Sequence, residues 1–276
     1  MKTRPATTWR SRFAGWNTDA RTAATPCAFC PSVRTVARLL LLLPLLAGSA
    51  STRADPGYYL VTVYDNQGQA NIDFRYWTVK NKGSGEIIWP EIGIGYGVTP
   101  RWFTGVLASY IGSGSTATRP SNLQWQNDFM LTQGQYDIDL ALHTLLIRND
   151  DRADGNALEF GPALQTDLDR FRLNTNLIFE KSWSRAAARP VQLKYQWQVN
   201  YRWRPAFQFG LQGFGEVGEW DRWLPSQRQS HRLGPVVSGT LAVGTPDALH
   251  YQFAYLDGKI YGRRGHMVSM RLNYTF

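Results

Sequence analysis

The sequence predicts an all-β protein, folded as an antiparallel up-and-down transmembrane β-barrel of about twelve strands. Three observations predict this fold class. From residue 71 onward, apolar and polar residues alternate with a period of two, and the alternating segments have nearly uniform lengths. The polar breaks between these segments are alternately short and long. A segment of secretory type precedes the whole array.

The alternation is clearest in residues 191–201. Its odd-numbered residues are Val, Leu, Tyr, Trp, Val and Tyr, and its even-numbered residues are Gln, Lys, Gln, Gln and Asn. Successive side chains of a strand point to opposite faces, so this strand has one apolar and one polar face. We expect twelve such strands, at 71–79, 88–98, 101–111, 123–131, 136–147, 157–168, 171–181, 191–201, 206–217, 232–243, 249–256 and 266–276. Such lengths suit a tilted crossing of a bilayer, which takes about 9–11 residues.

The breaks predict the topology. Short breaks lie at 99–100, 134, 169–170, 204–205 and 245–246, and longer polar breaks lie near 80–87, 112–122, 148–156, 182–190, 218–231 and 257–265. Bacterial transmembrane barrels have short turns at one end, long loops at the other, and an even number of strands. The carboxyl terminus therefore lies on the short-turn side.

Aromatic side chains gather near the predicted strand ends. Tyr96, Trp102 and Phe103 flank one short turn. Six tryptophans lie towards the long loops: Trp77, Trp89, Trp125, Trp183, Trp220 and Trp223. We interpret this distribution as two girdles of amphipathic rings at the two membrane interfaces.

Residues 58–64, with the sequence YYLVTVY, are open to three interpretations. They extend the first strand, form a small hairpin, or tuck into the lumen. A membrane strand here would raise the count to fourteen, because single-chain bacterial barrels have even numbers of strands. We assign residues 55–70 to an amino-terminal extension or the start of the first strand, and residues 71–276 to the barrel.

The positive charge belongs to the leader and not to the part that folds. Residues 1–54 hold eight of the 30 basic and one of the 21 acidic side chains, which leaves 22 basic and 20 acidic ones in residues 55–276. This near balance argues against nucleic acid as a partner. Cys27 and Cys30 also lie in the leader, so the barrel needs no disulfide.

A soluble β-sandwich or lipocalin-like barrel would also show alternation, with its apolar face inward. Three features favour the membrane barrel instead. The polar face is rich in Gln and Asn and has few clusters of Lys and Glu, the strands are long and uniform, and the chain ends on an aromatic residue that completes an alternating strand.

The last strand carries a resemblance to a known class. Val268, Met270, Leu272, Tyr274 and Phe276 resemble the carboxyl-terminal signature of bacterial outer-membrane barrels, which the assembly machinery recognises. The resemblance implies location in the outer membrane, contact with its lipid and lipopolysaccharide, and assembly through Phe276. More loosely, the layout is similar to proteobacterial barrels of the phenol-degradation meta-pathway transporter type, and no functional residues are carried over from that likeness.

The polar faces supply the candidate functional residues. The candidates for lining the lumen are Glu91, Asp128, Asp137, Asp139, His143, Glu159, Arg172, Glu180, Lys194, Arg202, Glu216, Arg232 and Arg271. Opposite charges along a narrow lumen indicate a solute channel or transporter-like porin, selective by electrostatics. The alternative is a plugged structural or adhesive barrel without conductance, in which the same groups pair with one another.

An outer-membrane lipid hydrolase is a third hypothesis. His143 shares a predicted strand face with Asp137 and Asp139, but no serine lies near it in sequence and no GxSxG motif occurs. We therefore expect no enzyme. No HxxxH or Cys/His spacing predicts a metal ligand set, and the glycines of GIGYG precede no helix, so we expect neither a metal nor another cofactor.

Residues 1–54 are predicted to be a signal peptide. Their apolar run, 39–47, is interrupted by Pro44 and is shorter than the about 20 residues of a spanning helix. Basic residues precede the run and small residues follow it, as in a secretory signal.

We expect cleavage after Ala50 or Ala54, and translation from near Val33 or Val36, because 32 preceding residues are long for the basic region of a signal. Amino-terminal sequencing of the exported protein checks the cleavage site, and the same sequencing of the uncleaved precursor checks the start. A mature protein that begins elsewhere than at residue 51 or 55, or a precursor that begins well before Val33, would contradict the corresponding expectation.

Overall fold

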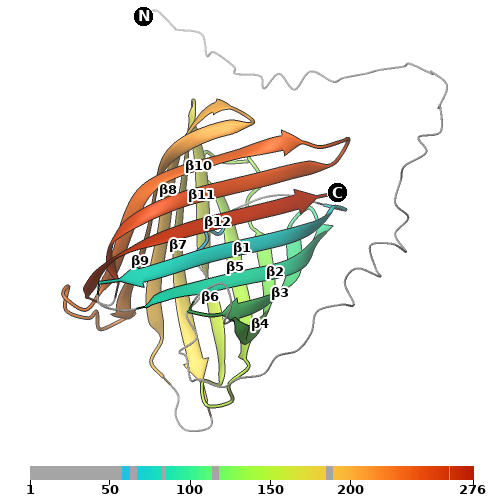
Figure 1. Ribbon diagram of the computed structural model, residues 1–276. Helices are drawn as coiled ribbons and strands as arrows, with labels where there is room; N and C mark the ends of the chain where they lie inside the picture. Colours follow the sequence, from blue (N-terminus) through green and yellow to red (C-terminus); the bar gives the residue numbers. More distant parts are fainter. Residues whose placement is uncertain (1–57, 63–66, 83–84, 114–117, 185–188, 261) are drawn as a thin grey trace, which may run out of the picture. The chain divides into compact units, whose positions relative to one another are not determined.

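The computed structural model describes residues 58–62, 67–82, 85–113, 118–184, 189–260 and 262–276. The predicted signal peptide lies outside these residues. Within them, twelve antiparallel strands close into a barrel in which each strand pairs with its sequence neighbours and β1 pairs with β12. Figure 1 shows the strands tilted around one lumen, with the carboxyl terminus at the end of β12. The predicted twelve-stranded, all-β fold is confirmed.

The strands are β1 (Ala70–Asn81), β2 (Glu86–Thr99), β3 (Trp102–Ile111), β4 (Arg119–Met130), β5 (Asp139–Asn149), β6 (Asn156–Leu168), β7 (Phe171–Trp183), β8 (Gln192–Arg204), β9 (Phe207–Glu219), β10 (Ser230–Ala242), β11 (Ala248–Ile260) and β12 (Arg263–Thr275). Most of them extend beyond the ends predicted from sequence, because cross-strand pairing continues through polar residues that carry no alternation. No helix long and apolar enough to cross a bilayer occurs in the described part of the chain.

Two of the predicted breaks differ most from the structure in length. The break at 134 is longer than predicted, because the Asp139 carboxylate accepts a hydrogen bond from the Gly134 backbone N–H at 2.7 Å and holds residues 131–138 in a turn. The break predicted near 257–265 is much shorter, since β11 and β12 remain paired up to Ile260 and Arg263. Gly262 there has a φ of 79°, a left-handed conformation that a tight turn needs and that favours glycine.

The two faces of the barrel are oriented as the membrane hypothesis requires. Ile94, Leu211 and Phe253 point outward and are 68%, 50% and 44% exposed, whereas Gln126 and Gln212 point inward and are buried. A soluble barrel would show the reverse arrangement, because its apolar face would fill the centre. The apolar exterior therefore fits a hydrocarbon surrounding, and closure of the sheet leaves no edge strand with unpaired backbone groups.

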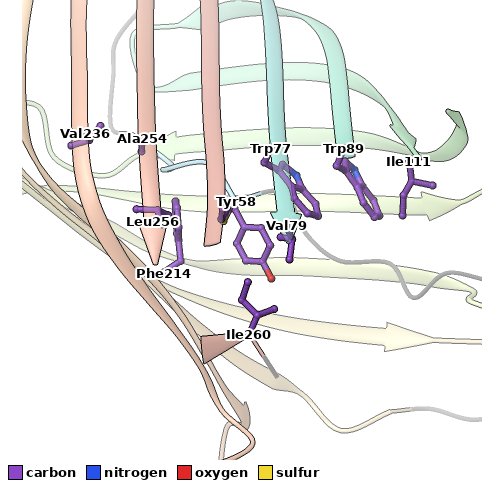
Figure 2. Close-up of a cluster of buried hydrophobic side chains, with 11 residues drawn as sticks. Tyr58, Trp77, Val79, Trp89, Ile111, Phe214, Val236, Ala254, Leu256 and Ile260 are labelled. Atoms are coloured by element: carbon purple, nitrogen blue, oxygen red, sulfur yellow. The ribbon is translucent and has the colours of Figure 1, made fainter. Parts of the chain in front are cut away.

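The interior is not polar throughout. A lumen cluster of buried apolar side chains occupies the loop side of the lumen (Figure 2). It comprises Tyr58, Trp77, Val79, Trp89, Ile111, Phe214, Val236, Ala254, Leu256, Ile260 and Met267.

Trp77 and Trp89 correct the predicted girdle. They lie directly opposite each other on β1 and β2, stack with ring centroids 5.0 Å apart, and are buried inside the barrel. The strand period explains this position: Trp77 shares its face with Asp73 and Arg75, and Trp89 shares its face with Glu91, all of which point inward. For these two tryptophans, the odd or even position along the strand predicts the inward orientation, whereas closeness to the strand end does not.

The carboxyl-terminal strand closes the barrel against its first strand. The backbone N–H of Phe276 donates to the Ala70 carbonyl at 2.9 Å, and Asn71 lies opposite Thr275. Val268 and Phe276 point outward, as the alternation of this strand predicts.

A charge on the outer face is expected to be far more costly than one at the polar lumen. We expect Phe253→Arg, near the middle of β11, to destabilise the barrel by about 2–4 kcal/mol, because it places a charge in lipid. Gln208→Arg, on the inward face of β9, is the control and is expected to fold normally. Urea titration in lipid vesicles and the gel shift on heating measure both; equal stability of the two variants would contradict the orientation.

Candidate functional site

Residues 58–62, the internal segment, lie inside the barrel. Tyr58, Tyr59, Leu60 and Val61 are at most 5% exposed. Of the three interpretations open for this region, the structure shows the insertion into the lumen for residues 58–62. Residues 63–66 lie outside the described residues, and Gln67 forms a bridge with Gly97 at the turn end of β2. The segment therefore belongs to the lumen and adds no strand to the wall.

Polar wall residues hold the backbone of the internal segment. The Val61 N–H donates to Gln196 Oε1 at 3.0 Å, and Asn176 Nδ2 donates to the Val61 carbonyl at 2.7 Å. At the other end, Ser269 Oγ donates to the Tyr58 carbonyl at 2.7 Å. These bonds come from β7, β8 and β12, so the segment is fixed across the lumen and not along one wall. Buried backbone groups are thereby satisfied.

Tyr58 inserts its ring into the lumen cluster. The ring meets Trp77 edge to face, with centroids 5.0 Å apart, and the Arg232 guanidinium lies 3.9 Å from the centroid of the tyrosine ring. The phenol hydroxyl donates to Glu216 Oε1, which also accepts from Arg232 Nη2 at 2.7 Å. Figure 2 shows Tyr58 among the cluster side chains, with its hydroxyl directed away from Trp77. A cation near a ring face and a carboxylate at the hydroxyl together fix this side chain.

Tyr59 packs against the second charged group of the lumen. Arg75 lies 3.6 Å from its ring centroid, and Arg271 lies 5.8 Å from it. Both arginines pair with Asp73, with N–O distances of 2.7 and 2.8 Å. Burial raises the pKa of the Tyr59 phenol, opposed by the nearby Arg75 charge, so the side chain remains neutral in the physiological range.

Glu91 lies beside this group. It accepts hydrogen bonds from Ser109 Oγ at 2.8 Å and Gln124 Nε2 at 3.0 Å, and its other oxygen lies 4.0 Å from Arg75 Nη1. Arg75 also donates to Gln126 Oε1 at 2.8 Å. This hydrogen-bonded network joins side chains of β1, β2, β3 and β4 on the inner face of the barrel.

Two further groups of charged side chains lie along the inner wall, and one of them, Asp128 with His143, joins the first network because Gln126 Nε2 donates to Asp128 Oδ2 at 2.5 Å. Lys194 pairs with Glu180 and, at 3.2 Å, with Glu159. His143 Nδ1 lies 2.5 Å from Asp128 Oδ1, and both side chains are buried. Three strands, β6, β7 and β8, supply the lysine group, and two strands, β4 and β5, supply the histidine pair.

The remaining predicted residues lie at the turn end. Arg172 and Arg202 both pair with Asp167, with N–O distances of 2.9 and 2.7 Å. Asp137 does not line the lumen, because it lies exposed in the turn before β5. Asp139 begins β5 but directs its carboxylate to the Gly134 N–H of the same turn. The alternation between 136 and 140 had suggested strand, and the side chain–backbone bond in the turn overrides it.

Two open cavities lie at the ends of the barrel, one at the loop ends of β3 to β7 and one at the turn ends of β6 to β12. A loop-side vestibule of about 770 Å³ is lined by residues that include Ser109, Tyr110, Asn122, Arg148, Arg152 and Trp183. A turn-side vestibule of about 280 Å³ is lined by residues that include Thr62, Asn174, Gln198, Asn200, Gln252 and Arg271. The cavities found between the segment and the wall measure about 10 and 20 Å³. Each of these two spaces holds about one water molecule.

Sequence reasoning missed the aromatic contacts of the internal segment and the apolar lumen cluster. Parity with Asp73 and Arg75 would have placed Trp77 inside, as noted above. By contrast, no spacing in the sequence couples Tyr58 to Arg232, because 174 positions separate them. No group of three or more His, Cys, Asp or Glu side chains in the described part of the chain is arranged to hold a metal ion.

The barrel is similar to two solved structures. One is the NanC porin, with a TM-score of 0.50 and 12% identity, covering 74% of this chain and 98% of that one. The other is an outer membrane channel from Pseudomonas putida F1, with a TM-score of 0.54 and 12% identity, covering 81% of this chain and 100% of that one. No protein-family model and no curated protein matches the sequence.

These likenesses concern the fold. Together with the apolar exterior and the polar, charge-paired interior, they define the chain as a transmembrane β-barrel of the outer-membrane type.

The Lys194 group provides a test of the paired interior. We expect Lys194→Met to destabilise the barrel by about 3–5 kcal/mol, because it leaves two buried carboxylates without their shared cation. The triple variant Lys194→Met, Glu159→Gln, Glu180→Gln is the matched control and should recover most of the loss. Urea unfolding in vesicles measures both, and a single variant as stable as the wild type would contradict the pairing.

Proposed function

We propose that this protein is an outer-membrane channel for small solutes, closed at its centre by the internal segment. One observation carries the proposal: an open cavity lies at each end of the barrel, and residues 58–62 are buried in the lumen, with Thr62 in the lining of the turn-side cavity. A barrel filled for structural reasons alone needs no cavities of about 280 and 770 Å³ at its two ends. Twelve strands enclose a lumen between the filled eight-stranded and the open sixteen-stranded cases.

The contacts of the segment suit a reversible closure. The hydrogen bonds described for its backbone run to neutral amide and hydroxyl groups, each of which contributes about 0.5–1.5 kcal/mol net. The charged groups beneath it are paired within the wall, as in Arg75 with Asp73. If the segment withdrew, these charged groups would become exposed to water, but each would keep its partner of opposite charge in the wall.

The two similar structures support the same function class. One is described as a porin and the other as an outer membrane channel. We also propose that outer-membrane lipid and lipopolysaccharide surround the apolar exterior. We further propose that the assembly machinery recognises the last strand and Phe276, because Val268 and Phe276 point outward.

Two alternatives are weaker. A plugged structural or adhesive barrel accounts for the internal segment but not for the open vestibules. A lipid hydrolase based on His143 would need that side chain to reach lipid, yet it is buried in the lumen and bonded to Asp128. We therefore propose that the protein is not an enzyme.

A reversible disulfide tests the closure. Val61 packs with Ala163 in one buried cluster, and residues 55–276 contain no cysteine. We expect Val61→Cys with Ala163→Cys to form a disulfide that holds the segment in place and keeps conductance in planar bilayers low. Reduction should restore wild-type openings, and deletion of residues 58–62 should give larger and longer conductance steps.

The single variant Val61→Cys is the control and should not respond to oxidant. Silence of the wild type, the reduced double variant and the deletion variant alike would overturn the channel and favour the sealed barrel. Conductance that is equal in the oxidised and reduced forms would show that the segment does not close the lumen.

A further inference from the structure

We propose that the outer face of β11, β12 and β1, at their loop-side end, binds the phosphate groups of lipopolysaccharide. The site, which we call the basic patch, comprises Lys80, Lys82, Lys259, Arg264 and His266, all of them exposed. The proposal goes beyond the channel function and does not depend on it. It rests on the lipopolysaccharide surrounding proposed above and names the place where this lipid binds.

The alternation of the three strands directs the patch outward. Lys80, Lys259 and His266 each follow or precede a residue of the lumen cluster that points inward. These inward neighbours are Val79, Ile260 and Met267. Successive side chains of a strand point to opposite faces, so the three patch residues face the exterior, and Arg264 does so two positions before His266. Figure 1 shows β11, β12 and β1 side by side, as their pairing requires.

Strand pairing arranges the patch in two rows. In the upper row, Lys259 lies directly opposite Arg264, and the Lys82 backbone N–H donates to the Arg264 carbonyl at 3.1 Å, so three cations stand next to one another. In the lower row, Lys80 lies opposite His266. Directly opposite residues have Cβ atoms about 4.5–5.5 Å apart, and like charges at such positions destabilise a sheet. A bound anion would remove this repulsion.

The carboxylates of the two rows do not neutralise the patch. Arg264 pairs with Asp257 at 3.4 Å, but the two side chains are 83% and 45% exposed, so water and salt screen this pair. Glu86 lies opposite Lys80 on the neighbouring strand β2. The two rows thus contain four Lys and Arg side chains and two carboxylates, which leaves two positive charges in excess.

The patch begins where the apolar exterior ends. Tyr255 and Val268 lie opposite each other, point outward, and are 51% and 38% exposed. His266 is the next outward residue of β12 and stacks on Tyr255 with ring centroids 6.0 Å apart, and Arg264 is the outward residue after it. Two residues of a strand advance by about 7 Å, so the cations lie just above the apolar band. Long Lys and Arg stems can lie along apolar surface while their charged ends reach the head groups.

This position and charge together indicate the ligand. The long loops of bacterial barrels face the cell exterior. The outer leaflet on that side consists of lipopolysaccharide, whose lipid part carries two phosphate groups on a sugar pair directly above the acyl chains. Clustered Lys and Arg side chains at a membrane surface bind anionic head groups, and guanidinium groups form paired hydrogen bonds with phosphate. A row of three cations suits a lipid with two phosphate groups better than a phospholipid with one.

Three lipids test the ligand class. Native mass spectrometry of the exported protein in detergent measures binding of bisphosphorylated lipid A, of lipid A without its phosphate groups, and of phosphatidylglycerol, all in the presence of EDTA. We expect bisphosphorylated lipid A to bind at least about tenfold more tightly than either of the others. Binding of another lipid within tenfold of it, a requirement for Mg²⁺, or displacement by an equal concentration of inorganic phosphate would each overturn the proposal.

Substitutions in the upper row assign the binding to the patch. The triple variant Lys82→Gln, Lys259→Gln, Arg264→Gln removes three cations and should weaken lipid A binding at least about tenfold, equivalent to about 1.4 kcal/mol. The triple variant Lys82→Arg, Lys259→Arg, Arg264→Lys keeps the charges and should bind lipid A like the wild type. The gel shift on heating confirms that both variants fold, so a loss in the first alone reports the charge.

A matched control removes three cations elsewhere at the loop end. Arg148→Gln, Lys181→Gln and Arg222→Gln come from β5, from β7 and from the loop after β9, so they form no row. This triple variant has the same change in net charge and should bind lipid A like the wild type. An equal loss in both glutamine variants would indicate attraction by overall charge and would overturn the site.

The patch, the lipid surrounding and the channel fail separately. Specific lipid A binding to a protein without conductance would support the patch and reject the channel. Conductance without preference for phosphorylated lipid A would reject the patch alone. Equal binding of lipid A with and without phosphate groups would likewise reject the patch, and it would leave the proposed lipid surrounding of the apolar exterior in place.

Discussion

The structure depends on one constraint: a strand in a closed barrel presents one face to lipid and the other to a confined lumen, and no third surrounding exists. Lipid accepts polar groups poorly, so the polar side chains in the middle of the wall, such as Arg75, Gln126 and Gln212, point inward. The narrow lumen has too little room for water to hydrogen-bond all of these polar groups. They therefore bond to side chains on other strands. Asp73, Arg75 and Arg271 show this: one carboxylate serves two guanidinium groups from β1 and β12.

The same constraint explains why an aromatic segment fits a lumen full of charge. Once Arg75 and Arg232 are paired with carboxylates, their guanidinium faces remain flat and weakly hydrated, and a tyrosine ring covers each of them. Tyr58 adds a hydroxyl that reaches Glu216, so the ring brings its own polar partner into an apolar cluster. An aliphatic side chain would fill the same space without satisfying the carboxylate.

Period-two alternation predicted most of the fold. In a membrane barrel each strand residue faces either lipid or the lumen, and its polarity indicates which of the two it faces. The alternation predicted twelve strands and placed Phe253 outside and Gln198 inside. It failed where local chemistry competes with pairing, as in the turn that the Asp139 carboxylate holds. For the candidate site, parity placed Glu91 and Lys194 on the inner face, but pairing between strands far apart in sequence follows from barrel closure and leaves no local pattern. The position of residues 58–62 stayed open for the same reason: a short apolar run fits a strand, a hairpin and a lumen equally well.

The pairing of charges within the wall also decides how a closed lumen can open. If the segment supplied the only partner of a buried charge, its departure would leave that charge alone at a cost of several kcal/mol, and the barrel would stay sealed. Here Lys194 has Glu159 and Glu180, Arg232 has Glu216, and Arg271 has Asp73. The segment contributes rings, backbone bonds and the Tyr58 hydroxyl to a wall whose charged groups already have partners of opposite charge, and water can replace its hydrogen bonds. A lumen built in this way can be both fully occupied at rest and stable when empty, which a channel closed by its own chain requires.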